Sequence, residues 1–203
     1  MKNETNFKTT VTKEEIALLP RTKFCGEIRN IDTLDAFYEF FPLLNNELLL
    51  GFDTETKPAF KKGVINEVSL LQLSTSDQAF LFRLNYIGLP KPLLQLLSDP
   101  EIIKAGVAVR DDLSVLNRLS KFNPAGFIDL QKMVKDYGIE DNGLKKLAAN
   151  ILGFNISKRQ QTSNWEQEQL SIGQIEYAAT DAWICYEIYK ILKNSPINNA
   201  GEN

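Results

Sequence analysis

Residues 48–52 form an unbroken apolar run, Leu-Leu-Leu-Gly-Phe, which has the length of a β-strand and ends at Asp53. A strand that lacks alternating polar residues is buried on both faces, as in the sheets of α/β proteins. The layers that cover such a sheet are helices. The run therefore favours a domain built around a covered sheet, with an acidic side chain at the end of a central strand.

Further strand-length and helix-length patterns flank this run. Apolar periodicity predicts strands at residues 48–53, 68–74, 79–84, 102–109 and 127–130, with a further short edge strand at 24–28. Capping residues and apolar stripes predict helices at residues 13–19, 33–44, 90–97, 112–119, 143–152 and 171–192, and one that Gly138 ends. This order predicts an α/β fold in which helices cover both faces of a mixed sheet of five strands.

The segments outside this pattern are polar. Residues 1–20 are expected to be an N-terminal extension, with residues 1–12 loosely attached, residues 21–193 to form the domain, and residues 194–203 to be a polar tail. No stretch has the ~18 consecutive apolar residues of a membrane helix, and the first ten residues lack the apolar region of a secretory signal. We therefore expect a cytoplasmic protein with no membrane partner.

The chain contains no histidine among its 203 residues. This excludes Ser-His and Cys-His triads, histidine-ligated zinc and a histidine general base, so any catalysis relies on carboxylates, Tyr, Lys, Ser or a metal. The formal net charge of −3 argues against a protein that coats nucleic acid non-specifically. It leaves room for an enzyme that grips a few nucleotides and offsets its own charge with bound metal.

Asp53 and Glu55 are two acids, two residues apart, at the end of the central strand. Strand side chains alternate, so both carboxylates point to the same side. Neighbouring carboxylates repel each other unless a proton or a cation lies between them, and their hard oxygen atoms suit a divalent metal. A solvated strand end explains the same two residues about as well, so this motif alone leaves both interpretations open.

A second acidic motif, Asp111-Asp112, follows the strand expected at residues 102–109 and begins a helix. Acids in the first turn of a helix are favoured by the helix dipole. Taken alone, Asp112 is therefore better explained as a helix-start charge than as a metal ligand.

A third motif, Tyr177-Ala-Ala-Thr-Asp181, lies within the last predicted helix. Its tyrosine and aspartate are four residues apart and share a face. Asp181 is surrounded by apolar and small residues that allow another element to approach closely, and an acid in such a place needs a partner. An exposed acid on the polar side of the helix is the alternative.

Together these motifs resemble those of the DEDD superfamily of 3'→5' exonucleases, in the branch that has tyrosine rather than histidine in its third motif. The resemblance covers residues 48–192 and is closest to the Werner-type exonuclease domain and the nuclease domain of ribonuclease D. Ser163-Asn164-Trp165, followed by Tyr-Ala-Ala-Thr-Asp-Ala at residues 177–182, also resembles the Werner-type domain. The absence of histidine fits the tyrosine branch.

This resemblance implies a ribonuclease H-like fold with a five-stranded mixed sheet and two divalent cations, Mg²⁺ or Mn²⁺. It implies that Asp53 bridges both ions, that Glu55 and Asp181 complete the site beside the attacking water, and that Asp112 holds the second ion. Tyr177 would orient the water. The expected reaction removes nucleoside 5'-monophosphates from the 3' ends of DNA or RNA, with DNA somewhat favoured by the Werner-like motifs.

Several residues near these motifs are candidates for contact with the nucleic-acid strand. Two groups of basic residues carry the positive charge that binds phosphates: lysines in the loop after the strand that ends at Asp53, and the pair Lys158-Arg159 just before Gln160. Solvent-exposed loops explain both groups as well. A tryptophan is a candidate for stacking on a base, although packing within the domain is the better explanation for it. The candidates are Thr54, Thr56, Lys62, Arg110, Lys158, Arg159 and Trp165.

Two other functions explain parts of the pattern. A catalytically silent module that binds nucleic acid or protein would share the fold, but such a module is expected to lose at least one of the four acids or Tyr177. A glycoside hydrolase uses a pair of carboxylates, but it leaves the third and fourth acids unexplained. Metal-dependent release of mononucleotides separates the first from an exonuclease, and sensitivity to a chelator separates the second.

Overall fold

The computed structural model of the protein describes residues 7–59 and 66–197. Within these residues, one mixed sheet has the strand order β1-β4-β3-β2-β5-β6. The strands are β1 Glu27–Ile31, β2 Leu49–Thr56, β3 Val68–Ser74, β4 Gln78–Arg83, β5 Ile103–Gly106 and β6 Phe127–Asp129. β2 pairs antiparallel with β3 and parallel with β5, so the predicted buried strand lies in the interior of the sheet, where strand direction changes.

The predicted mixed sheet is confirmed, but the predicted number of five strands is wrong. The described residues form six strands, and the additional one is β1, which pairs in parallel with β4 at the edge of the sheet. A short edge strand was expected at residues 24–28, a few residues too early. Only Ile31 of β1 is fully buried, and so weak an apolar signal does not fix the bounds of an edge strand.

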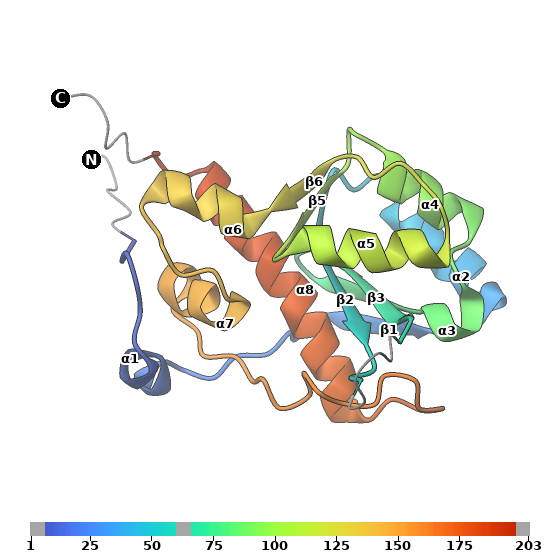
Figure 1. The fold of residues 1–203 in the computed structure, drawn as a ribbon, viewed down its shortest axis with the longest axis horizontal. Helices are drawn as coiled ribbons and strands as arrows, with labels where there is room; N and C mark the ends of the chain where they lie inside the picture. Colours follow the sequence, from blue (N-terminus) through green and yellow to red (C-terminus); the bar gives the residue numbers. More distant parts are fainter. Residues whose placement is uncertain (1–6, 60–65, 198–203) are drawn as a thin grey trace.

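Helices cover both faces of the sheet, and α1 packs against Ala149 rather than on the sheet. The described α-helices are α1 Lys13–Leu18, α2 Leu34–Phe40, α3 Leu84–Ile87, α4 Lys91–Ser98, α5 Val109–Leu119, α6 Leu130–Met133, α7 Leu144–Leu147 and α8 Ile172–Lys193. Figure 1 shows the long α8 running beside the strands, with α6 and α7 on its far side. No described helix combines the length and the apolar character that crossing a membrane requires.

Alternating side chains of β2 enter two different cores. Leu50 and Phe52 are fully buried in one core, together with side chains of α2, α4 and α5. Gly51 faces α8, and a Cβ atom on it would lie 1.9 Å from the carbonyl oxygen of Ala182. Only a glycine allows so close an approach, so Gly51 lets α8 lie directly on β2. This contact sets the distance between the acids of β2 and those of α8.

The start of α8 is fixed by a capping box, as the sequence predicts. The Ser171 side chain accepts a hydrogen bond from the backbone N–H of Gln174, and the Gln174 side chain accepts one from the backbone N–H of Ser171. Such a box satisfies two N–H groups that the helix itself leaves without partners. The capping box therefore fixes where α8 begins, and with it the direction in which the side chains of Tyr177 and Asp181 point from the helix.

The boundary between β5 and α5 differs from the prediction. The apolar run to Val109 was expected to be strand, but β5 ends at Gly106 and α5 already begins at Val109. Ala108 has the left-handed backbone conformation, with φ of 57°, and this turns the chain sharply. A non-glycine residue rarely adopts this conformation, so the sequence gives no signal for the turn. As a result, Asp111 and Asp112 lie in the first turn of α5.

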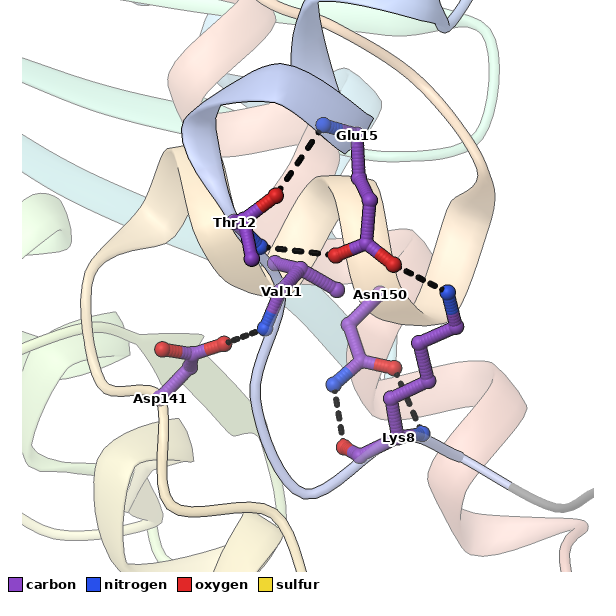
Figure 2. Close-up of polar contacts among 6 residues, drawn as sticks. All are labelled: Lys8, Val11, Thr12, Glu15, Asp141 and Asn150. Atoms are coloured by element: carbon purple, nitrogen blue, oxygen red, sulfur yellow. Dashed lines mark hydrogen bonds and ion pairs between the residues drawn. The ribbon is translucent and has the colours of Figure 1, made fainter.

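The N-terminal segment is attached at several points, so the expectation that residues 1–12 are loosely attached is wrong for residues 8–12. The backbone N–H of Val11 donates to Asp141, and the backbone of Lys8 exchanges two hydrogen bonds with the side chain of Asn150 (Figure 2). Thr12 forms a capping box with Glu15 at the start of α1. Residues 1–6 lie outside the described residues, and the expected domain boundaries after residues 20 and 193 remain predictions.

Candidate active site

Three of the four predicted metal-binding acids meet where β2 passes under α8. One carboxylate oxygen from each of Asp53, Glu55 and Asp181 lies within 4.8 Å of the others. β2 presents the first two on the face toward α8 because strand side chains alternate. Glu55 and Asp181 are only 8% and 6% exposed, so solvent screens the repulsion between their carboxylates poorly.

Asp112 stands close to this group but is held from the other side of β2. Its carboxylate accepts a hydrogen bond of 2.5 Å from the hydroxyl of Thr54, whose side chain points away from α8. The charge of Asp112 still contributes to raising the pKa of Asp53. The four acids therefore form one electrostatic group, in which Asp112 takes its position from α5 and Thr54.

Burial and mutual repulsion make these carboxyl groups hard to ionise. Burial, followed by the charges of Asp112 and Asp181, raises the pKa of Asp53 well above its usual value. Burial, followed by the neighbouring acids, raises the pKa of Glu55 to about 10. Burial raises the pKa of Asp112 and of Asp181 to about 7. A buried set of like charges is stable only when protons or cations neutralise it, and this donor set of hard oxygens fits divalent cations.

Tyr177 lies one helical turn before Asp181 and faces the same group of acids. Burial, followed by the charges of Asp181 and Glu55, raises the pKa of its hydroxyl far above the usual value. The hydroxyl therefore remains protonated and available as a hydrogen-bond donor. A hydrogen bond with Tyr177 partly offsets the effect of burial on the pKa of Asp181.

A cavity of about 280 Å³ opens over these residues. The acids Asp53, Glu55 and Asp181 and the hydroxyl-bearing Tyr177 line it together with Lys158 and Lys145. The charge of Lys158 lowers the pKa of Asp181, so Lys158 lies close enough to the acids to contact an anion bound there. This position agrees with the contact to nucleic acid predicted for Lys158. Lys145 was missed because its position on an amphipathic helical stretch does not show which way it faces.

The other residues predicted to contact nucleic acid do not gather at one site. Arg159 lines an adjoining cavity, whereas Arg110 is exposed on α5 and lines a different hollow beside Leu113 and Phe127. Thr56 is half-buried at the end of β2, and the Thr54 side chain is engaged by Asp112. Lys62 lies outside the described residues.

Trp165 is not placed to stack on a base, so its predicted contact with nucleic acid is corrected. Its side chain is fully buried and packs against the ring of Tyr177, with 6.1 Å between the ring centroids. It belongs to the core beneath the N-terminal half of α8. Trp165 therefore supports Tyr177 from behind, which agrees with the packing role that the sequence favours for it.

Comparison with known proteins gives a consistent picture. A family model described as 3'-5' exonuclease matches residues 28–196. Exonuclease 3'-5' domain-containing protein 2 of Drosophila melanogaster is 36% identical over 148 residues, which are 71% of this chain and 25% of that protein. Ribonuclease D of Gluconacetobacter diazotrophicus is 34% identical over 151 residues, which are 73% of this chain and 38% of that protein.

Solved structures agree with these relatives. The EXO domain of Aedes aegypti Nibbler superposes with a TM-score of 0.74 and 27% identity, covering 85% of this chain and 91% of that domain. Ribonuclease D of Escherichia coli, at 24% identity, has a TM-score of 0.73 and supports the fold. The chain spans about a quarter to about half of the length of the first curated relatives that it matches.

Proposed function

Because the chain belongs to the 3'-5' exonuclease family, we propose that it hydrolyses phosphodiester bonds one nucleotide at a time from the 3' end of a nucleic-acid strand. The observation that carries this proposal is the buried meeting of Asp53, Glu55 and Asp181, within 4.8 Å, at the floor of a cavity. The family match confirms the resemblance to 3'-5' exonucleases seen in the sequence. The superposition on solved exonuclease structures confirms the ribonuclease H-like fold class. The products are proposed to be nucleoside 5'-monophosphates.

The carboxylates are proposed to hold two divalent cations, Mg²⁺ or Mn²⁺. Asp53, Glu55 and Asp181 would hold one ion, and Asp112 together with Asp53 would hold the other. When bound, such ions lower the pKa of water and stabilise negative charge on the attacked phosphate. Their binding would also neutralise the acids, which removes the repulsion that raises the carboxyl pKa values.

The other residues of the site have roles that their positions support. The protonated hydroxyl of Tyr177 would donate a hydrogen bond that orients the attacking water. Lys158 lines the same cavity as the acids and would contact the non-bridging oxygens of the phosphate. Thr54 would hold the carboxylate of Asp112 in one orientation.

We propose RNA as the preferred strand, in place of the mild preference for DNA expected from the sequence motifs. The support is that relatives over most of this chain include a protein named ribonuclease D. An RNA complex of the ribonuclease D of Trypanosoma brucei is among the structures with the same fold. The cytoplasmic location expected from the sequence also remains a proposal.

The test is cleavage of a 5'-labelled single-stranded RNA and of a 5'-labelled 3'-recessed DNA duplex, each with Mg²⁺ or Mn²⁺. The proposal predicts a ladder that shortens from the 3' end, faster on RNA, and absent with EDTA or in Asp53→Ala. A faster ladder on DNA overturns the RNA preference alone. No ladder on either strand, from folded protein with bound metal, favours the silent binding module and overturns the proposed activity.

A further inference from the structure

A second cavity, of about 490 Å³, adjoins the one above the acids and is lined by positive side chains. We call it the cationic cavity, and its charged lining residues are Arg21, Lys23, Lys145, Lys158 and Arg159. Among the described residues, no acidic side chain lines it. The whole chain has a net charge of −3, so a cavity lined by five positive side chains is unlike the rest of the molecule.

The two cavities share part of their walls. Lys145 and Lys158 line both of them, as do Ile156 and Ser157. A ligand that places one anionic group at the acids can therefore place the next anionic group in the cationic cavity. Only a ligand with several negative groups in a row uses both places.

Most of these positive side chains have no ion-pair partner among the described residues. In the part of the chain that the structure describes, Arg21, Lys145, Lys158 and Arg159 form no ion pair. Lys23 pairs with Glu176 of α8 at the margin of the cavity. Like charges gathered in one hollow repel each other, so an anion bound among them is favoured.

One wall of the cationic cavity is built by the N-terminal segment. The backbone N–H of Thr22 donates to the carbonyl of Asn155 at 3.2 Å, and the N–H of Asn155 donates to the carbonyl of Pro20 at 2.9 Å. Two residues later, the N–H of Phe24 donates to the hydroxyl of Thr180, the neighbour of Asp181. These bonds hold Arg21 and Lys23 between the segment that carries Lys158 and the helix that carries the acid.

The segment before this wall is fixed as well. Figure 2 shows Val11 bonded to the buried Asp141, and Lys8 bonded to Asn150 beside α7. The match to the family model begins at residue 28, so the whole N-terminal wall lies outside the matched region. The two cations that it contributes therefore come from outside the matched region.

We propose that the cationic cavity binds a backbone phosphate of the same strand that is being degraded, next to the phosphate at the acids, with Arg21 and Lys23 as the contacts added by the N-terminal wall. This inference rests on the proposed function. Arginine and lysine are the residues that most often contact phosphate oxygens, and such contacts position a strand without reading its sequence. The added contacts strengthen binding of strands that have at least two phosphates.

The test compares a single-stranded 12-mer with a dinucleotide that has no terminal phosphate. The dinucleotide has a single phosphate, which binds at the acidic site, so no phosphate remains to bind in the cationic cavity. In the variant Arg21→Gln/Lys23→Gln, KM for the 12-mer is expected to rise about 10-fold, while kcat/KM for the dinucleotide changes less than about 2-fold. The magnitude of the slope of log kcat/KM against log salt for the 12-mer falls by up to about 0.7, since each neutralised phosphate contributes roughly 0.7 on single strands.

The matched control is Arg118→Gln, which removes an exposed arginine of α5 that lines neither cavity. This variant is expected to leave both substrates and the salt slope unchanged, and thermal unfolding confirms that all variants are folded. An unchanged 12-mer KM, or an equal loss on both substrates, overturns the inference while leaving the proposed function intact. A wild-type protein that cleaves neither substrate overturns the proposed function itself.

Discussion

Asp181 stands on α8 between Thr180 and Ala182 and is almost completely buried against the acids of β2. An ionised carboxylate in such a place costs free energy unless a cation or a proton neutralises it. The burial of Asp181 beside these acids therefore destabilises the folded protein when no metal is bound. Its benefit appears when divalent cations bind.

Asp181→Asn separates the functional role of this residue from its effect on stability. The substitution removes one charge from the group, so in EDTA at pH 8 the variant is expected to unfold at a higher temperature than the wild type. Its cleavage rate should fall by roughly 10³-fold or more, as for other groups that contact the reacting atoms. Calorimetry and a labelled-strand assay measure the two effects, and a variant that is both less stable and fully active contradicts this interpretation.

Thr54→Val tests whether the hydrogen bond to Asp112 positions that acid. The change preserves shape but leaves the carboxylate without a donor, and bonds to charged groups are worth about 1.5–3 kcal/mol. We expect kcat to fall about 10-fold with little change in KM for the strand. Thr54→Ser keeps the hydroxyl and should restore most of the rate. If valine and serine behave alike, the bond has no positioning role.

At the scale of elements, the site depends on how closely α8 approaches β2. Gly51 and Ala182 provide this approach, since a Cβ atom on residue 51 would meet the backbone of α8 at 1.9 Å. The sequence shows both small residues, and it predicted α8 nearly in full and β2 as far as Asp53, three residues short of its end at Thr56. It does not show that Gly51 faces Ala182, because the two are 131 positions apart and no local pattern links them.

Gly51→Ala is expected to displace α8 and to destabilise the fold by about 1–3 kcal/mol, the usual cost of overpacking a core. Because the displacement separates Asp181 from Asp53, activity should fall more than stability alone explains. The matched control is Gly173→Ala, where a new Cβ meets the flexible end of Gln160 at 3.1 Å rather than a backbone atom. Denaturant unfolding of both variants measures the difference, and equal effects would contradict the packing argument.

The parts of the fold that sequence patterns missed are those that lack a local signal. The attachment of residues 8–12 depends on partners more than 100 positions away, and the left-handed turn at Ala108 is made by a residue type that rarely adopts that conformation. By contrast, the capping box of α8 is local, and the sequence predicted it correctly. The close meeting of Asp53, Glu55 and Asp181 was predicted only through family resemblance, because each motif on its own also fits an ordinary solvent-exposed acid.

At the scale of the whole molecule, the stability of the metal-free protein should depend on pH. Asp112 and Asp181 have pKa values raised to about 7, and Glu55 to about 10, whereas the unfolded chain has ordinary carboxyl pKa values near 4. The folded state therefore binds more protons than the unfolded state between about pH 4 and these raised values. Since stability then falls as pH rises, the contribution is fully present below about pH 4 and is lost through pH 7 and above.

In EDTA, the unfolding temperature is therefore expected to decrease steadily from pH 5.5 to pH 8.5. Saturating Mg²⁺ replaces the missing protons, so it should raise the unfolding temperature much more at pH 8.5 than at pH 5.5. Differential scanning calorimetry across this range, in both conditions, measures the effect. In Asp181→Asn the pH dependence should be weaker, and a wild-type curve that is flat in EDTA would contradict the proposed electrostatics.

The most direct test of a metal-dependent exonuclease site is a calorimetric titration of Mn²⁺ into the protein, with cleavage of a labelled strand followed at the same Mn²⁺ concentrations. We predict that two ions bind to the wild type, that cleavage rises as they bind, and that Asp181→Asn loses at least one ion and the cleavage together while remaining folded. Mn²⁺ binding that is unchanged in Asp181→Asn, or 3' cleavage that persists without bound metal, would contradict the proposed site.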